Sequence, residues 1–394
     1  MEQKREPIIR LVMLNKVLFL SAWYPHRYNA MSGLFVRKYA EAVARCLNVC
    51  VLYLYADDKV EKFDVEQKKT GNLTEIFIYF PFCHNRYFRT FSKAINYFRA
   101  FLKGYQLVRE NFGCPDVCHA NVLTRSAFLA FLLQKTKQIP YVVSEHWSRY
   151  LPENYSYNGF LRKVATKLVV RNAQCIMPVS ALLKEAMQNC NLQHPNYQIV
   201  PNVVDDFFYN NQPKQPREKK RILHISCFDE KAKNLCGILN MIKKLSAKRN
   251  DFELIIVGTG VDFNQIQNYS TSLQLGNVVK FVGEQTPKQV YDWLRQSDFL
   301  LMFSNYETSG VIFSEAFACG RPVVSTPVGM MQEMTNEVGR IVPIKDEQEL
   351  LNAVNFMLDN FQLFDEKVIQ SFAQKFTYSS IAEKLVGIYN NAIC

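Results

Sequence analysis

The chain has 394 residues, of which 48% are hydrophobic and 21% charged, and its formal net charge is +11 at pH 7. This composition is typical of a folded globular protein and excludes a disordered chain, and the longest apolar run, Ala127–Leu133, is far shorter than the roughly 20 residues of a membrane-spanning helix. The length exceeds what one hydrophobic core usually organises, so about two domains are expected.

The first 25 residues contain basic and then apolar residues, which faintly resembles a signal peptide. Asn15 and Lys16 interrupt the apolar part and no small-x-small cleavage site follows, so Lys16–Pro25 is interpreted as a first β-strand. Met13 is an alternative start to Met1, with the first residues a disordered extension. Eleven cysteines lack the spacing of a zinc site or a disulfide framework, which indicates a reducing compartment.

Short apolar segments rich in Val, Ile and Leu alternate with helical patterns along the chain. Such segments are typical of strands buried on both faces of a parallel sheet, and the alternation predicts doubly wound α/β domains. The expected strands of the first half are Val17–Ser21, Val49–Tyr55, Glu75–Phe80, Val117–Ala120, Tyr141–Ser144, Cys175–Pro178 and Gln198–Pro201. Those of the second half are Ile222–Ser226, Leu254–Val257, Val278–Val282, Phe299–Phe303, Val323–Ser325 and Arg340–Val342.

The polar segment Asp205–Lys220 contains two prolines and a charge run, which is typical of an interdomain linker. We therefore expect one Rossmann-like domain over residues 1–204, a linker over 205–220 and a second Rossmann-like domain over 221–375. Residues 376–394 have the amphipathic pattern of a helix, which is predicted to pack back on the first domain.

The segment Phe82–Asn111 combines a basic and an apolar pattern. Its apolar residues recur at helical spacing and are expected to pack on the sheet: Phe88, Phe91, Ile95, Phe98, Leu102 and Tyr105. The cations around them are expected to meet anionic lipid headgroups: Arg86, Arg89, Lys93, Arg99 and Lys103. Residues 1–195 carry a net charge of +13 and the remainder −2. No RNA-binding motif or recognition helix is present, so nucleic acid is not an expected partner.

Two glutamates stand eight residues apart at the end of an expected strand. Glu307 lies in the loop after Phe299–Phe303, and Glu315 lies about one turn inside the following helix. Ligands of open α/β sheets bind at this edge, and the amides at the helix start suit a diphosphate: Ser309, Gly310 and Val311. Two flanking carboxylates could then bond the hydroxyls of a ribose and of a transferred sugar. The simpler alternative is that Glu315 complements the helix dipole and Glu307 is a solvated loop residue.

Six segments together resemble the retaining GT-B glycosyltransferases of family 4, and the resemblance covers nearly the whole chain. Residues 307–329, ETSGVIFSEAFACGRPVVSTPVG, resemble the E-x7-E region of the family. The other five are SAWYPHRYNAMSGLFVRKYA, PYVVSEHWSRY, VPNVVD, ELIIVGTG and VVKFVGEQTPKQVYDWLRQSDFLLMFSNYE. The resemblance implies two Rossmann-like domains that face a cleft.

The resemblance also implies a role for individual residues of the second domain. Glu307 would contact the transferred sugar and Glu315 the ribose. Lys233 would neutralise the leaving phosphates. The remaining residues of the donor site would be Ser309, Gly310, Val311 and Gly258.

In the first domain, the resemblance implies a catalytic His146 at the end of a buried strand, facing the cleft, although a structural histidine is the alternative. Gly33 would let a ligand approach its loop, if it is not an ordinary strand–helix turn. Asn202 belongs to a PNG-x-D segment in which Val203 replaces the usual glycine.

The chain departs from the family where an arginine usually precedes the lysine. Cys227 or Phe228 stands there, so one cation is missing, and Lys231 could substitute for it or for Lys233. NAD is not expected, because Phe263 breaks the G-x-G-x-x-G pattern that begins at Gly258. No Asp-x-Asp pair occurs, so we predict a reaction without a metal or any other cofactor.

The expected activity is transfer of a hexose or related sugar from a UDP- or GDP-linked donor to a lipid-linked or cell-surface glycan acceptor. A bacterial enzyme of polysaccharide or lipopolysaccharide synthesis is expected, cytoplasmic and peripheral on the inner membrane face. The alternatives are a sugar-nucleotide epimerase of the same fold and a non-catalytic membrane-associated subunit. The nucleotide base, sugar and acceptor are left open.

Overall fold

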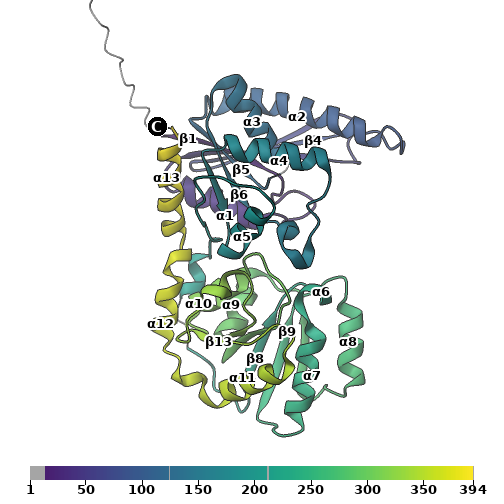
Figure 1. Ribbon diagram of the computed structural model, residues 1–394, viewed down its shortest axis with the longest axis vertical. Coiled ribbons are helices and arrows are strands. Elements are labelled where there is room, and N and C mark those ends of the chain that lie inside the picture. The colour runs from purple at the N-terminus through teal and green to yellow at the C-terminus, as the bar shows by residue number, and fades with distance from the viewer. Residues whose placement is uncertain (1–13, 124, 211–212, 394) are drawn as a thin grey trace, which may run out of the picture.

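A computed structural model of the protein describes residues 14–123, 125–210 and 213–393. It contains two sheets, each covered by helices on both faces, which lie one above the other in Figure 1. Two Rossmann-like α/β domains were predicted, and the sheets confirm them. The candidate start at Met13 lies outside the described residues.

The first domain is built on a seven-stranded sheet of order β3-β4-β2-β1-β5-β6-β7. Its strands are β1 Lys16–Ser21, β2 Asn48–Ala56, β3 Asp64–Thr70, β4 Leu73–Phe80, β5 Val117–Asn121, β6 Tyr141–Glu145 and β7 Cys175–Pro178. Its helices are α1 Leu34–Ala44, α2 Arg89–Asn111, α3 Arg125–Lys137, α4 Phe160–Asn172 and α5 Ala181–Asn189. All neighbouring strands run parallel except β3 and β4.

The second domain is built on a six-stranded parallel sheet of order β10-β9-β8-β11-β12-β13. Its strands are β8 Lys220–Ile225, β9 Phe252–Val257, β10 Val279–Gly283, β11 Phe299–Met302, β12 Val323–Ser325 and β13 Gly339–Ile341. The helices that follow the linker are α6 Glu230–Lys233, α7 Leu235–Ser246, α8 Phe263–Ser272, α9 Pro287–Arg295, α10 Val311–Ala318, α11 Glu347–Asn360, α12 Glu366–Ala373 and α13 Tyr378–Ile393.

One strand prediction for the first domain was wrong, and one strand was missed. Gln198–Pro201 is not a strand, although the amides of Gln198 and Val200 bond to β7 at 3.0 and 3.1 Å. Pro178 of β7 has no N–H to donate in return, so the ladder is incomplete. The antiparallel β3 was missed because its residues are mostly polar, as exposed edge strands often are.

The C-terminal helix α13 leaves the second domain and packs on the first, as the yellow segment in Figure 1 shows. Ile381, Leu385 and Ile388 lie in the same apolar cluster as α1 and the strands β1 and β2. The Tyr389 hydroxyl also shares a 2.7 Å hydrogen bond with the buried His119 ring. One face of the first sheet is therefore covered by the first and last helices of the chain.

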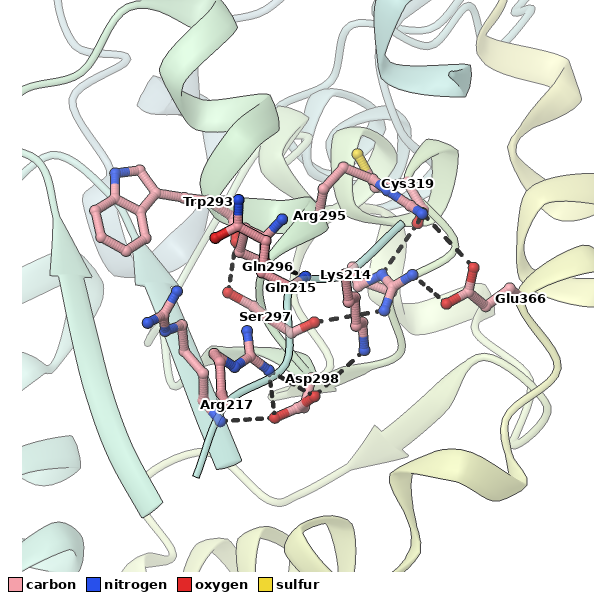
Figure 2. A network of polar contacts seen from close by, with 12 residues as sticks. Lys214, Gln215, Arg217, Trp293, Arg295, Gln296, Ser297, Asp298, Cys319 and Glu366 are labelled. Carbon is pink, nitrogen blue, oxygen red and sulfur yellow. Dashed lines mark hydrogen bonds and ion pairs between the residues drawn. The ribbon is translucent and has the colours of Figure 1, made fainter. Parts of the chain in front are cut away.

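The linker is packed against the second domain at two places. Its first part forms a 3-10 helix over Asp206–Tyr209, and Phe208 is buried against the ring of Tyr291. Further along, Lys214 and Arg217 converge on the buried Asp298 just before β11 (Figure 2). This polar network fixes the linker at the amino end of β11, opposite the edge where the two glutamates lie.

The apolar face of α2 was predicted to pack on the sheet, and for most of its residues this prediction was wrong. Phe88, Phe91 and Phe98 are 62, 67 and 45% exposed. The residues that α2 buries instead are Ala100, Phe101, Gly104 and Val108. Within the described residues, no helix is both long and apolar enough to cross a membrane.

Candidate active site

The loop between β11 and α10 forms a helix start with free amides. Gly310 precedes α10 at a φ of +74°, and a Cβ there would lie 2.4 Å from the ring of Phe313. The fold therefore requires glycine at this position. Three consecutive amides have no hydrogen-bond acceptor among the described residues, those of Ser309, Gly310 and Val311. Such amides at a helix amino end can bind an anion.

Beside this helix start, the Nζ of Lys233 forms an ion pair with Oε1 of Glu307. The hydroxyl of Ser304 donates a second hydrogen bond, of 3.1 Å, to the same oxygen. Both charged side chains are only 12% exposed. Burial opposes the charge on Lys233, but the Glu307 carboxylate outweighs it and raises the pKa of the lysine. Lys233 therefore keeps its positive charge at neutral pH.

Lys233 is positioned by the short helix α6, which is tied to the loop that carries Glu307. The amide of Asn305 bonds to the carbonyl of Ala232 at 2.7 Å, and its side-chain amide bonds to the carbonyl of Lys231 at 2.9 Å. Asn234 then ends α6 in the left-handed conformation. Lys231 is exposed and makes no ion pair with a described residue, so it is Lys233 that reaches Glu307.

Cys227 and Phe228, the two residues where an arginine was expected, differ in their burial. Phe228 is 1% exposed and stacks on Phe263, whereas Cys227 is exposed, so of these two side chains only that of Cys227 faces solvent. Gly258 lies behind this segment at a φ of +129°, and a Cβ there would lie 1.9 Å from the carbonyl oxygen of Ser226. Gly258 is thus needed for the crossing of two chain segments.

Glu315 lies on the fifth residue of α10, and its carboxylate makes no hydrogen bond with the described residues. Burial raises its pKa to about 7, and the nearby Asp205 adds to this effect. Lys38 acts in the opposite direction, but its ammonium is engaged by Asp205 at 2.9 Å. The side chain of Glu315 is half-buried, and its unpartnered carboxyl group is available to hydroxyl groups of a ligand.

His146 follows β6 and is 8% exposed. Its ring lies 4.4 Å from that of Phe35, and both ring nitrogens are buried without a hydrogen-bond partner. Burial lowers its pKa to about 3, so the imidazole is neutral. A neutral imidazole can both donate and accept a hydrogen bond, which suits a hydroxyl group.

Glu145, which the sequence reasoning missed, positions the chain around His146. Its buried carboxylate accepts hydrogen bonds from the amides of His146, Trp147 and Leu123 at 2.8, 2.9 and 2.8 Å. One side chain thus ties the loop after β6 to the loop after β5. A charged residue at the end of an otherwise apolar strand was the available signal.

The close packing of the backbone around residue 33 requires a glycine there. Gly33 precedes α1 at a φ of +61°, and a Cβ there would lie 2.3 Å from the backbone carbonyl of Trp23. The glycine therefore allows two parts of the loop after β1 to meet. Backbone packing therefore accounts for a glycine at position 33 whether or not a ligand contacts it.

Two hydrogen bonds join the domains at the site. Asn202 donates to the hydroxyl of Ser309 at 3.2 Å, and the hydroxyl of Ser180 donates to the carbonyl of Thr308. Asn202 and Ser309, both predicted, are thus brought together, whereas Ser180 was missed. Ser180 also caps α5, a role that the sequence pattern of serine before a helix can reveal.

The described part of the chain holds no cluster of three or more His, Cys, Asp and Glu side chains that could bind a metal ion. Free amides, one buried cation and unpartnered carboxyl and imidazole groups are therefore what this site offers a ligand.

Two protein-family models match the chain. Residues 33–203 match the glycosyl transferase 4-like domain, and residues 205–371 match the glycosyl transferases group 1. The chain carries both domains of a family 4-type glycosyltransferase. The function expected of this glycosyltransferase is therefore sugar transfer from a nucleotide-sugar donor.

Relatives of this glycosyltransferase include two bacterial enzymes. N-acetyl-alpha-D-glucosaminyl L-malate synthase of Bacillus anthracis is 24% identical over 72% of this chain and 76% of its own length. The phosphatidyl-myo-inositol mannosyltransferase of Mycolicibacterium smegmatis is 23% identical over 70% of each chain.

Solved structures share the GT-B fold of this glycosyltransferase. Sucrose-phosphate synthase of Thermosynechococcus elongatus has a TM-score of 0.74 at 18% identity and covers 96% of this chain and 98% of its own. HepE of Anabaena, in complex with UDP and glucose, has a TM-score of 0.70 at 18% identity and covers 95 and 98%. The predicted family and the two-domain GT-B architecture are both confirmed.

Proposed function

We propose that the chain is a retaining glycosyltransferase that transfers a sugar from a UDP- or GDP-linked donor to a lipid-linked or cell-surface glycan acceptor. The observation that carries this proposal is the Lys233–Glu307 ion pair beside the free amides at the start of α10. A cation and a carboxylate side by side match the two ends of the bond that breaks, the leaving phosphate and the sugar.

In the proposed mechanism, the amides of Ser309, Gly310 and Val311 bind the donor diphosphate. Lys233 stabilises the charge that develops on the leaving phosphate, because its position is fixed before the reaction begins. Two negative phosphates compete with Glu307 for the ammonium, which frees that carboxylate to accept a hydrogen bond from the sugar. Glu315 accepts hydrogen bonds from the ribose.

The acceptor attacks from the face of the sugar that the diphosphate leaves, and the leaving phosphate removes the acceptor proton. This route retains the anomeric configuration without a covalent enzyme intermediate. In this route Glu307 accepts hydrogen bonds from Ser304 and from the sugar, and no carboxylate is needed as a nucleophile. The neutral ring of His146 binds a hydroxyl of the transferred sugar. Charge stabilisation by Lys233 and the amides makes a metal ion unnecessary in this scheme.

A membrane acceptor is supported by the first domain. The exposed cations Arg86 and Arg89 lie beside the exposed rings of Phe88 and Phe91 at the start of α2. Such a surface suits the cytoplasmic face of a membrane with anionic lipids, where the enzyme would be peripheral. One relative, the phosphatidyl-myo-inositol mannosyltransferase, is named for a lipid acceptor.

The test is incubation of the purified chain with a panel of radiolabelled UDP- and GDP-sugars and membrane lipid extract. Label that moves from one donor into a product with retained configuration supports the proposal. An epimer of the donor, an inverted product, or no turnover of any donor contradicts it.

A further inference from the structure

A cavity of about 790 Å³ opens in the first domain at the carboxyl ends of β1, β5 and β6. The helices α2, α3 and α4, which lie together in the upper domain of Figure 1, supply most of its wall. The volume is within the range of about 300–1,000 Å³ that is usual for ligand sites. The wall is largely apolar and includes Trp23, Tyr97, Phe98, Leu129, Leu132 and Val169.

Three arginines line the same cavity, and the described lining residues include no Asp or Glu. Arg125, Arg149 and Arg162 form no ion pair through their side chains with any residue in the described ranges. Arg149 is only 5% exposed, its Nε is buried without a hydrogen-bond partner, and its guanidinium lies over the ring of Trp147. The buried Glu145 acts electrostatically on Arg149 without forming an ion pair with it, and Arg125 and Arg162 have no carboxylate partner among the described residues, so this wall is complementary to an anion.

The cavity is joined to the proposed reaction site through aromatic rings. Trp147, on the cavity wall, directly follows His146 in the chain. The ring of Trp147 lies 5.0 Å from that of Trp23, which in turn lies 6.3 Å from Phe35, the residue that covers His146. The cavity is thus adjacent to the first-domain residue that we assign to the transferred sugar.

Apolar side chains next to the lining residues are turned to solvent. Phe91 on α2 and Phe160 and Leu161 on α4 are 67, 80 and 82% exposed. Large exposed apolar surfaces of this kind mark a binding or membrane surface. These exposed apolar side chains extend the apolar surface of α2 and α4 from the cavity wall to the outside of the domain.

We propose that this cavity binds the acceptor as a phosphate-bearing lipid. The hydrocarbon chain lies between α2, α3 and α4, and the phosphate lies against Arg125, Arg149 and Arg162. This assignment rests on the proposed function and names the chemical class of its acceptor. Among lipids and free anions, the combination of an apolar wall and three unpaired cations selects a molecule that has both parts.

The test uses the full chain with Trp293→Phe. Trp293 lies on α9 of the second domain, so this change leaves Trp23 and Trp147 in the cavity wall as the fluorescent reporters. Farnesyl phosphate, below its aggregation concentration, is expected to give a saturable change in emission. Farnesol and inorganic phosphate should each bind at least about tenfold more weakly, because each lacks one half of the recognised chemistry.

Two double variants locate the phosphate. Arg125→Gln with Arg162→Gln should weaken farnesyl phosphate binding about tenfold or more. Lys137→Gln with Arg171→Gln removes two charges from the same helices, α3 and α4, at exposed positions outside the lining, and should have no effect. All four residues are exposed, so folding is preserved, which far-ultraviolet circular dichroism checks.

Equal binding of farnesol, equal binding of inorganic phosphate, or wild-type affinity in the Arg125/Arg162 variant overturns the cavity assignment. The proposed function is tested separately with the panel of radiolabelled donors. If sugar is transferred to another acceptor while farnesyl phosphate does not bind, the cavity assignment fails and the transferase stands. If farnesyl phosphate binds as expected and no donor is turned over, the cavity is a site for a phosphate-bearing lipid, but the proposed function and with it the acceptor role of that lipid are overturned.

Discussion

Lys233 and Glu307 form an ion pair although 74 residues separate them in the chain. The pairing follows from the sheet order, because β8 and β11 are neighbours and the segments after both strands meet at one edge. The first prediction concerns this pair and Glu315. Glu307→Ala should lower kcat about 10²-fold and change UDP affinity little, because Glu307 is assigned to the sugar.

Glu315→Ala should instead weaken UDP binding about tenfold, through the ribose. Calorimetric titration with UDP and steady-state kinetics separate the two effects. Glu383→Ala, an exposed position on α13, serves as the control. Equal loss of UDP affinity in the Glu307 and Glu315 variants would contradict the assignment.

Glu315→Gln should stabilise the protein at high pH. The pKa of Glu315 is raised to about 7 in the folded state, so the folded protein holds a proton that the unfolded chain releases near pH 4.5. This carboxyl group therefore lowers stability as pH rises from about 4.5 to 7. Removing it should raise the unfolding free energy by about 1–2 kcal/mol at pH 8 and by almost nothing at pH 4. Urea unfolding at both pH values measures the difference, and an equal gain at pH 4 would contradict it.

Sugar transfer should continue in excess EDTA, because Lys233 and the α10 amides are expected to hold the diphosphate. The measurement is initial velocity with and without EDTA, after dialysis against a chelating resin. Loss of activity in EDTA with recovery on addition of Mn²⁺ would show that the enzyme needs a metal ion besides Lys233 and the α10 amides.

Cys227→Arg should tighten UDP binding by about tenfold, since it adds a second cation beside Lys233. The position is exposed, so a longer side chain is accommodated without repacking, and Cys46→Arg at another exposed cysteine is the control. Isothermal titration with UDP reads out the change. Unchanged affinity would mean that the exposed Cys227 does not face the diphosphate.

The full chain should sediment with vesicles that contain anionic lipid at low salt, and raising the salt to about 1 M should release most of it. Replacing Arg86, Arg89 and Lys93 with glutamine should weaken this binding and leave UDP affinity unchanged. The matched control replaces three exposed lysines outside the first domain, Lys219 of the linker and Lys243 and Lys248 of the second domain. Equal binding to neutral vesicles, or wild-type binding by the first triple variant, would show that Arg86, Arg89 and Lys93 do not bind anionic lipid.

The fold was largely predictable because buried parallel strands are apolar and bounded by turns. The edge strand β3 was not, since one of its sides lacks a partner and its residues are polar. The face of α2 was misjudged for a different reason. Helical spacing of apolar residues predicts burial but not the partner, so Phe91 and Phe98 were assigned to the sheet although they are exposed.

The site was predictable only in part. Glu307, Glu315 and Lys233 could be named from family motifs, but spacing could not predict the ion pair, which depends on strand order. Gly33 was assigned to ligand approach and Gly258 to the donor site, and both assignments stay predictions. Close backbone packing also requires glycine at both positions, which the sequence alone could not predict. Glu145 was missed because its role is to bind three amides of two loops, which only the folded chain brings together.

The position of α13 has a consequence for synthesis of the protein on the ribosome. Domains usually fold as units in the order in which they emerge. Here Tyr389 completes the hydrogen bonding of the buried His119, and Leu385 belongs to the core beside β1. The first domain to be translated is therefore the last to complete its fold, because the part of its sheet that α13 covers stays exposed until the C-terminal helix has left the ribosome.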